Sequence, residues 1–258
     1  MEKLKVTAPG LVEMKSRGEK ISVLTAYDYA TGRLIDESGI DVALVGDSLG
    51  MVVLGYETTL MVTMDDMIRH SAAVARGAKR ALVVADMPFM SYQTSADDAI
   101  RNAGALMQTG AGAVKLEGGE QVKEIVKRLV DIGIPVMGHV GLTPQSVHQF
   151  GGFKIQGKDA ENAERIRSEA MQLQEAGAFA VVLEMIPAAL AKEISESLSI
   201  PTIGIGAGPD CDGFVLVSHD MLGMYDKFVP SFVKQYANLW QTTLDAFKSY
   251  DADIKERR

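Results

Sequence analysis

Several short apolar stretches of this chain end at, or close to, an ionisable residue. The side chains concerned are Asp47, Asp86, Lys115, Glu117, His139 and Glu184. A carboxylate beside buried, apolar sequence is costly unless a cation or hydrogen bonds compensate its charge. If these residues met in one place, they could bind a cation and move protons.

Two or three carboxylates in one site suit Mg²⁺, which takes one or two protein carboxylates together with water and substrate oxygens. A single acid at the end of a strand is explained equally well by a helix cap or an ion pair. Five polar groups that converge, with Lys115 close by, favour a functional site over that explanation.

The apolar stretches have the length of strands, and most of them lack polar alternation, which is typical of strands buried on both faces. They predict strands over 21–27, 41–47, 80–86, 112–118, 135–141, 179–185, 201–207 and 213–220.

Stretches with helical spacing separate most of these strands. They cover 64–78, 95–110, 119–133, 159–177 and 187–199. Several begin with a polar capping residue such as Thr63 or Ser95 and end at glycine. The alternation of strand and helix predicts an α/β fold with a parallel sheet. Eight strands in this length favour a closed (β/α)8 TIM barrel with its active site at the C-terminal ends of the strands.

An open doubly wound sheet is the structural alternative, but the glycine-rich dinucleotide fingerprint that would follow its first strand is missing. In a barrel, all strand C-termini meet at one face, which explains why ionisable residues follow buried stretches so regularly. The connection 208–211 is too short to hold the helix expected between the last two strands.

Two connections, 48–63 and 142–159, are unusually long and follow strand C-termini, so both are expected to serve the site. No linker or low-complexity tract marks a boundary. We therefore expect one barrel domain over 1–258, with a short N-terminal helical segment at 7–18 and a charged, frayed or solvated C-terminal tail at 249–258.

Composition excludes several classes of protein. The net charge is −8 and no basic block occurs, which argues against a nucleic-acid binder. No apolar run approaches the ~20 residues of a membrane span. Cys211 is the only cysteine, so an intrachain disulfide and a cysteine-rich zinc site are excluded. We expect a cytoplasmic protein.

Long segments of the chain resemble the ketopantoate hydroxymethyltransferase family. The most particular are "GIDVALVGDSLGMVVLGYETTLMVTMDDMIRH", "IPVMGHVGLTPQSVHQFGGFKIQGK" and "IPTIGIGAGPDCDGFVLVSHDMLG", and the similarity spans nearly the whole sequence. The resemblance implies a (β/α)8 barrel that uses Mg²⁺ and 5,10-methylenetetrahydrofolate to convert 3-methyl-2-oxobutanoate to 2-dehydropantoate, a step of pantothenate biosynthesis. It also implies a homo-oligomer, a decamer built from pentamers.

The resemblance assigns roles to individual residues. It implies metal binding by Asp47, Asp86 and Glu117. It implies contacts with the 2-oxoacid by Asp47, Ser48, Asp86, Lys115 and His139, with the role of His139 the least defined. Glu184 matches the proton acceptor. The residues that contact the folate are not indicated.

Two alternatives stay open at this point. The chain could be another Mg²⁺-dependent barrel lyase or mutase that acts on a 2-oxoacid or phosphoenolpyruvate, since such enzymes share enolate chemistry but not the folate. It could also be a non-catalytic barrel, although the presence of Asp47, Asp86 and Glu184 argues against that.

Overall fold

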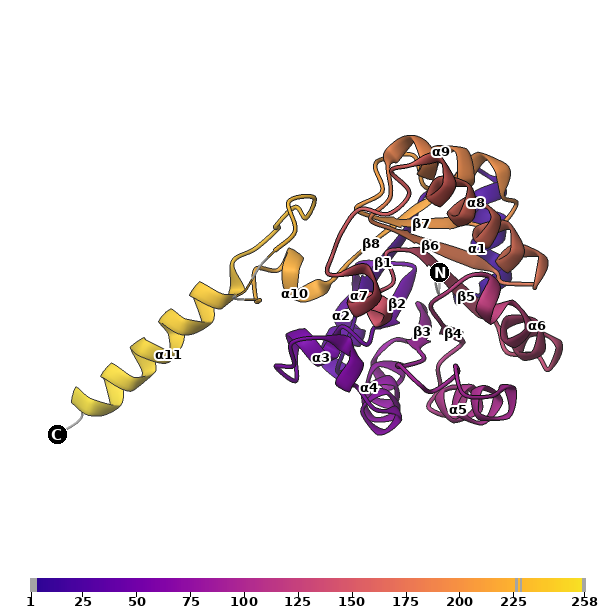
Figure 1. The fold of residues 1–258 in the computed structure, drawn as a ribbon. Coiled ribbons are helices and arrows are strands. Elements are labelled where there is room, and N and C mark those ends of the chain that lie inside the picture. Colours follow the sequence, from indigo (N-terminus) through magenta and orange to yellow (C-terminus); the bar gives the residue numbers. More distant parts are fainter. Residues whose placement is uncertain (1–3, 226, 228, 257–258) are drawn as a thin grey trace. The chain divides into compact units, whose positions relative to one another are not determined.

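The computed structural model describes residues 4–225, 227 and 229–256. Eight parallel strands form a closed barrel in chain order, as the sequence predicts (Figure 1). The strands are β1 (Ile21–Thr25), β2 (Val42–Val45), β3 (Leu82–Asp86), β4 (Ala113–Lys115), β5 (Val136–Gly141), β6 (Ala180–Glu184), β7 (Thr202–Ile205) and β8 (Gly213–Leu216).

Helices connect the strands and surround the barrel (Figure 1). They are α2 (Tyr29–Ser38), α4 (Met64–Gly77), α5 (Ala96–Gln108), α6 (Lys123–Asp131), α8 (Ala160–Glu175) and α9 (Ala188–Ser197). The last five confirm the predicted helices. Thr63 and Asp66 form a reciprocal capping box at the start of α4, and the Ser95 side chain caps α5. Helix α2, which the side chain of Asp28 caps at its N-terminus, was not predicted.

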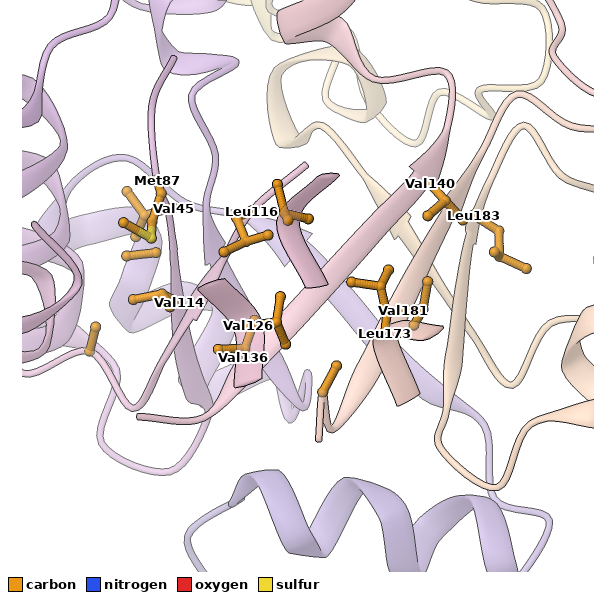
Figure 2. Close-up of a cluster of buried hydrophobic side chains, with 14 of the residues drawn as sticks. Val45, Met87, Val114, Leu116, Val126, Val136, Val140, Leu173, Val181 and Leu183 are labelled. Atoms are coloured by element: carbon orange, nitrogen blue, oxygen red, sulfur yellow. The ribbon is translucent and has the colours of Figure 1, made fainter. Parts of the chain in front are cut away.

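Strand residues alternate between two apolar layers, because successive side chains of a strand point to opposite faces. One set packs against the helices, as Figure 2 shows for Val114, Val136 and Val181 from the strands with Val126 of α6 and Leu173 of α8. The other set fills the barrel and includes Val42, Val84, Ala113, Met137, Val182 and Ile203. Helix α1 (Ala8–Ser16), which confirms the predicted N-terminal helix, adds Ala8 and Leu11 to this inner set.

The two long connections contain short helical turns. The first holds α3 (Leu49–Val52) and the 3-10 helix η1 (Thr59–Met61), and the second holds the 3-10 helix η3 (Pro144–Ser146) and α7 (Val147–Phe150). A further 3-10 turn, η2 (Glu120–Val122), precedes α6. Between β7 and β8 the described chain has no helix, as the short connection predicts.

The last predicted strand, 213–220, is too long. Strand β8 ends at Leu216, and helix α10 (Ser218–Met221) begins two residues later. The apolar run continues as far as Val217, so hydrophobicity alone does not mark the change from strand to helix.

By compactness the chain divides into Met1–Val215 and Leu216–Arg258. The second unit contains α10 and α11 (Leu239–Glu256), and backbone bonds from Tyr236 to Met221 and from Leu239 to Leu222 hold its connection. The tail predicted at 249–258 as charged and frayed or solvated is exposed as expected up to Glu256, but these residues continue α11 and are helical rather than frayed. A single domain over 1–258 stays a prediction.

A search of the described residues for long apolar helices that could cross a membrane found none.

Close packing of α2 on α4 depends on two glycines. A Cβ at Gly77 would lie 2.4 Å from the carbonyl oxygen of Tyr29, and one at Gly32 would lie 2.8 Å from that of Val74. Both contacts are with backbone, which cannot rotate away.

We therefore expect Gly77→Ala to lower the free energy of unfolding by about 1–3 kcal/mol, the usual cost of overpacking. Gly104→Ala, in α5, is the matched control, because a Cβ at Gly104 meets no atom within 4 Å. The control should be neutral or stabilising by up to about 1 kcal/mol. Denaturant unfolding of both variants measures this, and equal stabilities would contradict the packing argument.

Candidate active site

The ionisable residues singled out in the sequence come from neighbouring strands at one end of the barrel. Asp86, Lys115 and Glu184 are the last residues of β3, β4 and β6, and His139 lies on β5. Each lies two residues beyond a residue of the inner layer on the same strand, such as Val84, Ala113 or Val182, and so shares its face. Their side chains therefore point into the barrel above that layer.

Asp86 is the contact point of this cluster. Its Oδ1 accepts a hydrogen bond from Lys115 Nζ at 2.8 Å, and its Oδ2 accepts one from the Asp47 N–H at 3.1 Å. All three residues are buried. Asp47 follows β2 in the turn that leads to α3, so two carboxylates from adjacent strands lie together with one ammonium group beside them.

Glu117, His139 and Glu184 form a second row. His139 lies between the two acids, with Nδ1 3.6 Å from Glu117 Oε1 and Nε2 3.2 Å from Glu184 Oε2. Neither ring nitrogen has an aligned hydrogen-bond partner among the described residues, although the ring is buried. The Glu184 side chain is 16% exposed, the most open of this row. Met185, next along the chain, has a positive φ of 48°, a costly conformation that turns the backbone just after Glu184.

Ser48 lies at the edge of the cluster. Its hydroxyl is 2.9 Å from the hydroxyl of Tyr27, which follows β1 and is buried. Each of the sequence-predicted site residues thus lies at the C-terminal end of the barrel, at or just after a strand.

Two buried residues of the site were missed by the sequence reasoning. Gln145, in η3, donates to Asp47 Oδ2 at 2.9 Å from its side chain and to Glu117 Oε2 at 2.9 Å from its backbone. Tyr92 donates its hydroxyl proton to Gln145 Oε1 at 2.7 Å. Neither residue is charged or follows a strand directly. For Gln145 the available signal was the length of the connection 142–159, whereas Tyr92 lies in the connection between β3 and α5, which the sequence reasoning did not single out.

Burial and mutual repulsion change the protonation of the acids. Burial, and then the charge of Asp86, raise the pKa of Asp47 to about 7, against the opposing effects of Lys115 and Gln145. Burial, followed by the charge of Asp47, raises the pKa of Glu117 well above its ordinary value. The cluster therefore carries more negative charge than its surroundings stabilise.

The pKa values of the two bases, Lys115 and His139, shift in opposite directions. Burial alone would lower the pKa of Lys115, but the neighbouring carboxylates, Asp86 first, raise it further than burial lowers it, so the ammonium stays charged. Burial lowers the pKa of His139 more than Glu184 raises it, which favours the neutral imidazole.

The donor set fits a hard divalent cation. Asp47 and Asp86 supply two carboxylates, the number that Mg²⁺ usually takes from protein, and the raised pKa of Asp47 marks charge that a cation would stabilise. The described residues contain no group of three or more His, Cys, Asp and Glu side chains arranged to hold a metal ion. Mg²⁺ usually completes its coordination with water and substrate oxygens. Glu117 is linked to this pair through Gln145, which donates a hydrogen bond to Glu117 and another to Asp47.

The fold and the site define a (β/α)8-barrel protein with an acidic site at its strand C-termini. Solved structures share the fold. A phosphonopyruvate hydrolase, in complex with oxalate and Mg²⁺, superposes with a TM-score of 0.65 over 97% of this chain and 87% of its own, at 11% identity. A 2,3-dimethylmalate lyase of the PEP mutase/isocitrate lyase superfamily superposes with a TM-score of 0.62 over 98% of this chain and 88% of its own, at 15% identity.

Sequence comparison is more specific. The family model for ketopantoate hydroxymethyltransferase matches residues 5–258. A 3-methyl-2-oxobutanoate hydroxymethyltransferase of Syntrophus aciditrophicus (strain SB) is 60% identical over 97% of this chain and 93% of its own length. The 3-methyl-2-oxobutanoate hydroxymethyltransferase of Clostridium kluyveri is 61% identical over 95% of this chain and 88% of its own length. The chain belongs to the ketopantoate hydroxymethyltransferase family, and it is accordingly a transferase.

The shifted pKa of Asp47 predicts how stability depends on pH. The folded value of about 7 lies above the ordinary 3.8, so the folded state binds the proton more tightly than the unfolded state does. Stability is therefore lost as pH rises from about 4 to about 7. Asp47→Asn keeps an oxygen acceptor for Gln145 and removes the charge.

In the presence of a chelator, Asp47→Asn should raise the free energy of unfolding at about pH 8 by more than at about pH 5. Denaturant titrations at the two pH values measure this. A stabilisation that is larger at the lower pH would contradict the assigned charge state.

Proposed function

We propose that this protein catalyses the Mg²⁺-dependent transfer of a hydroxymethyl group from 5,10-methylenetetrahydrofolate to 3-methyl-2-oxobutanoate. The products are 2-dehydropantoate and tetrahydrofolate, in pantothenate biosynthesis. The names of the relatives supply the acceptor substrate and the kind of group transferred. The observation that carries the proposal is the contact of Asp47 with Asp86, with Lys115 beside them and Glu184 on the same face.

The 2-oxoacid is bound by its charged end. Lys115 offers an ammonium group whose raised pKa keeps it protonated, and the Ser48 hydroxyl can donate a further hydrogen bond. The Asp86–Lys115 ion pair holds the ammonium in one position, so the substrate meets a preorganised charge.

Asp47 and Asp86 would hold Mg²⁺, with Glu117 behind them, and the ion would supply Lewis-acid stabilisation of the negative charge that develops on the keto oxygen. The same two carboxylates are the reason that the site needs a cation, because their charges repel when both are ionised.

Glu184 removes the proton from C3 of the substrate as general base. It is the more open acid of its row, so a substrate can reach it. His139 contacts it, and because burial favours the neutral imidazole, the ring adds no positive charge that would weaken the base. Water adds to the methylene carbon while both of its bonds to folate nitrogens break, which releases tetrahydrofolate and leaves a formaldehyde equivalent. The enolate carbon then bonds to that carbon, and its oxygen takes up the proton removed from C3 to become the hydroxyl of the product. The folate would lie over this face, against the connections 48–63 and 142–159.

Cytoplasmic location and assembly into a homo-oligomer, a decamer on the family pattern, are part of the same proposal, and no nucleic-acid or membrane partner is expected.

The activity has a direct test. Purified protein with 3-methyl-2-oxobutanoate, methylenetetrahydrofolate and Mg²⁺ should form 2-dehydropantoate, and Asp47→Ala or Asp86→Ala should abolish turnover while the fold is retained. Circular dichroism checks the fold. Near-normal rates in both variants would contradict the metal assignment. Turnover of the 2-oxoacid without the folate would instead favour a lyase or mutase.

The base has a separate test. Glu184→Gln should lower exchange of the C3 deuteron of 3-methyl-2-oxobutanoate with solvent by about 10²–10⁴-fold, the usual contribution of a general base. Proton NMR follows the exchange without folate. Glu193→Gln, on the outer helix α9, is the matched control and should exchange normally. Exchange that survives in Glu184→Gln would assign the base to another residue.

A further inference from the structure

We infer that Gln145 is a positioning residue for the metal-binding carboxylates, and that Tyr92 fixes its orientation. This inference rests on the proposed function, because it concerns the same cation. Gln145 belongs to η3, in the long connection after β5, yet its side chain is buried among the ends of three other strands.

The side-chain amide of Gln145 uses its full hydrogen-bonding capacity. Nε2 donates to Asp47 Oδ2 at 2.9 Å and to the carbonyl oxygen of Met87 at 3.0 Å. Oε1 accepts from the hydroxyl of Tyr92 at 2.7 Å and from Gln93 Nε2 at 3.1 Å. An amide has two donors and one oxygen with two lone pairs, so this arrangement allows only one orientation of the group.

The backbone of Gln145 completes the bridge. Its N–H donates to Glu117 Oε2 at 2.9 Å, while the hydroxyl of Tyr92 accepts from the N–H of Glu117 at 3.2 Å. One residue therefore fixes Asp47, at the end of β2, relative to Glu117, just beyond β4. Hydrogen bonds to ionised groups are short and directional, so they set the rotamer of the carboxylate.

Such contacts matter because a cation requires its ligands at defined positions. Mg²⁺ demands near-ideal geometry, and residues that orient its ligands typically change affinity by 10–100-fold when they are lost. Without Gln145, Asp47 would lose its neutral donor and could turn toward Lys115. The ammonium of Lys115 already binds Asp86, so the cation would then compete with it for both acids.

The experiment measures metal binding rather than turnover. Binding of Mn²⁺, in the presence of 3-methyl-2-oxobutanoate, is followed by the loss of the free-ion EPR signal. Gln145→Met keeps the length of the side chain and removes its polar atoms. It should weaken Mn²⁺ binding by at least about tenfold, and the Mg²⁺ concentration needed for half-maximal activity should rise with it.

Gln156→Met is the matched control, since it makes the same change in the same connection. There the side-chain amide donates to the carbonyl of Lys154 and contacts none of the acids of the site among the described residues. Its Mn²⁺ affinity should stay within about twofold of wild type. Tyr92→Phe removes the donor that orients Gln145 and should weaken binding several-fold, so it tests the inference if Gln145→Met does not fold.

Wild-type affinity in folded Gln145→Met, or in Tyr92→Phe when the first variant does not fold, would overturn the inference. An equal loss in Gln156→Met would also overturn it, because the effect would then belong to the connection as a whole. Failure of the wild-type protein to bind Mn²⁺ would contradict the metal in the proposed function. The wild-type measurement therefore separates a failure of the proposed function from a failure of the role given to Gln145.

Discussion

The site depends on the burial of three carboxylates around one ammonium group. Asp47, Asp86 and Glu117 are each at least nine-tenths buried, and Lys115 forms an ion pair with Asp86. Burial, and then repulsion by a neighbouring acid, raise the pKa values of Asp47 and Glu117, and the single positive charge of Lys115 does not offset these effects. In the proposed function, a divalent cation and the anionic 2-oxoacid would complete this site. The remaining structure serves to hold these groups in place.

The barrel holds these groups in place because residues two apart on a strand point to the same face. Val84 and Asp86 share a face of β3, and Ala113 and Lys115 share a face of β4. The apolar layer below thus fixes the direction of the polar layer above it. Loop residues then connect neighbouring strand ends, as Gln145 does for Asp47 and Glu117, so precision comes from strands and loops together.

The sequence predicted the barrel and the site residues at the strand ends well. Strands buried on both faces appear as continuous apolar runs, and an ionisable residue lies at or near the end of several of these runs. It predicted less where the signal is local or tertiary. Val217 continues an apolar run, but the chain turns into α10. Tyr92 and Gln145 are neutral, and only the folded structure brings them beside Asp47. Helix α11 has no buried residue among those the structure describes, so no face packed on a core marks 249–256 as helical.

The most direct test is a crystal structure with Mn²⁺ and 3-methyl-2-oxobutanoate, with the metal located by anomalous scattering. The account predicts one ion bound directly to a carboxylate oxygen of both Asp47 and Asp86, and the 2-oxoacid within hydrogen-bonding distance of Lys115 Nζ. An ion bound elsewhere, or a 2-oxoacid bound while both aspartates remain without metal, would contradict it.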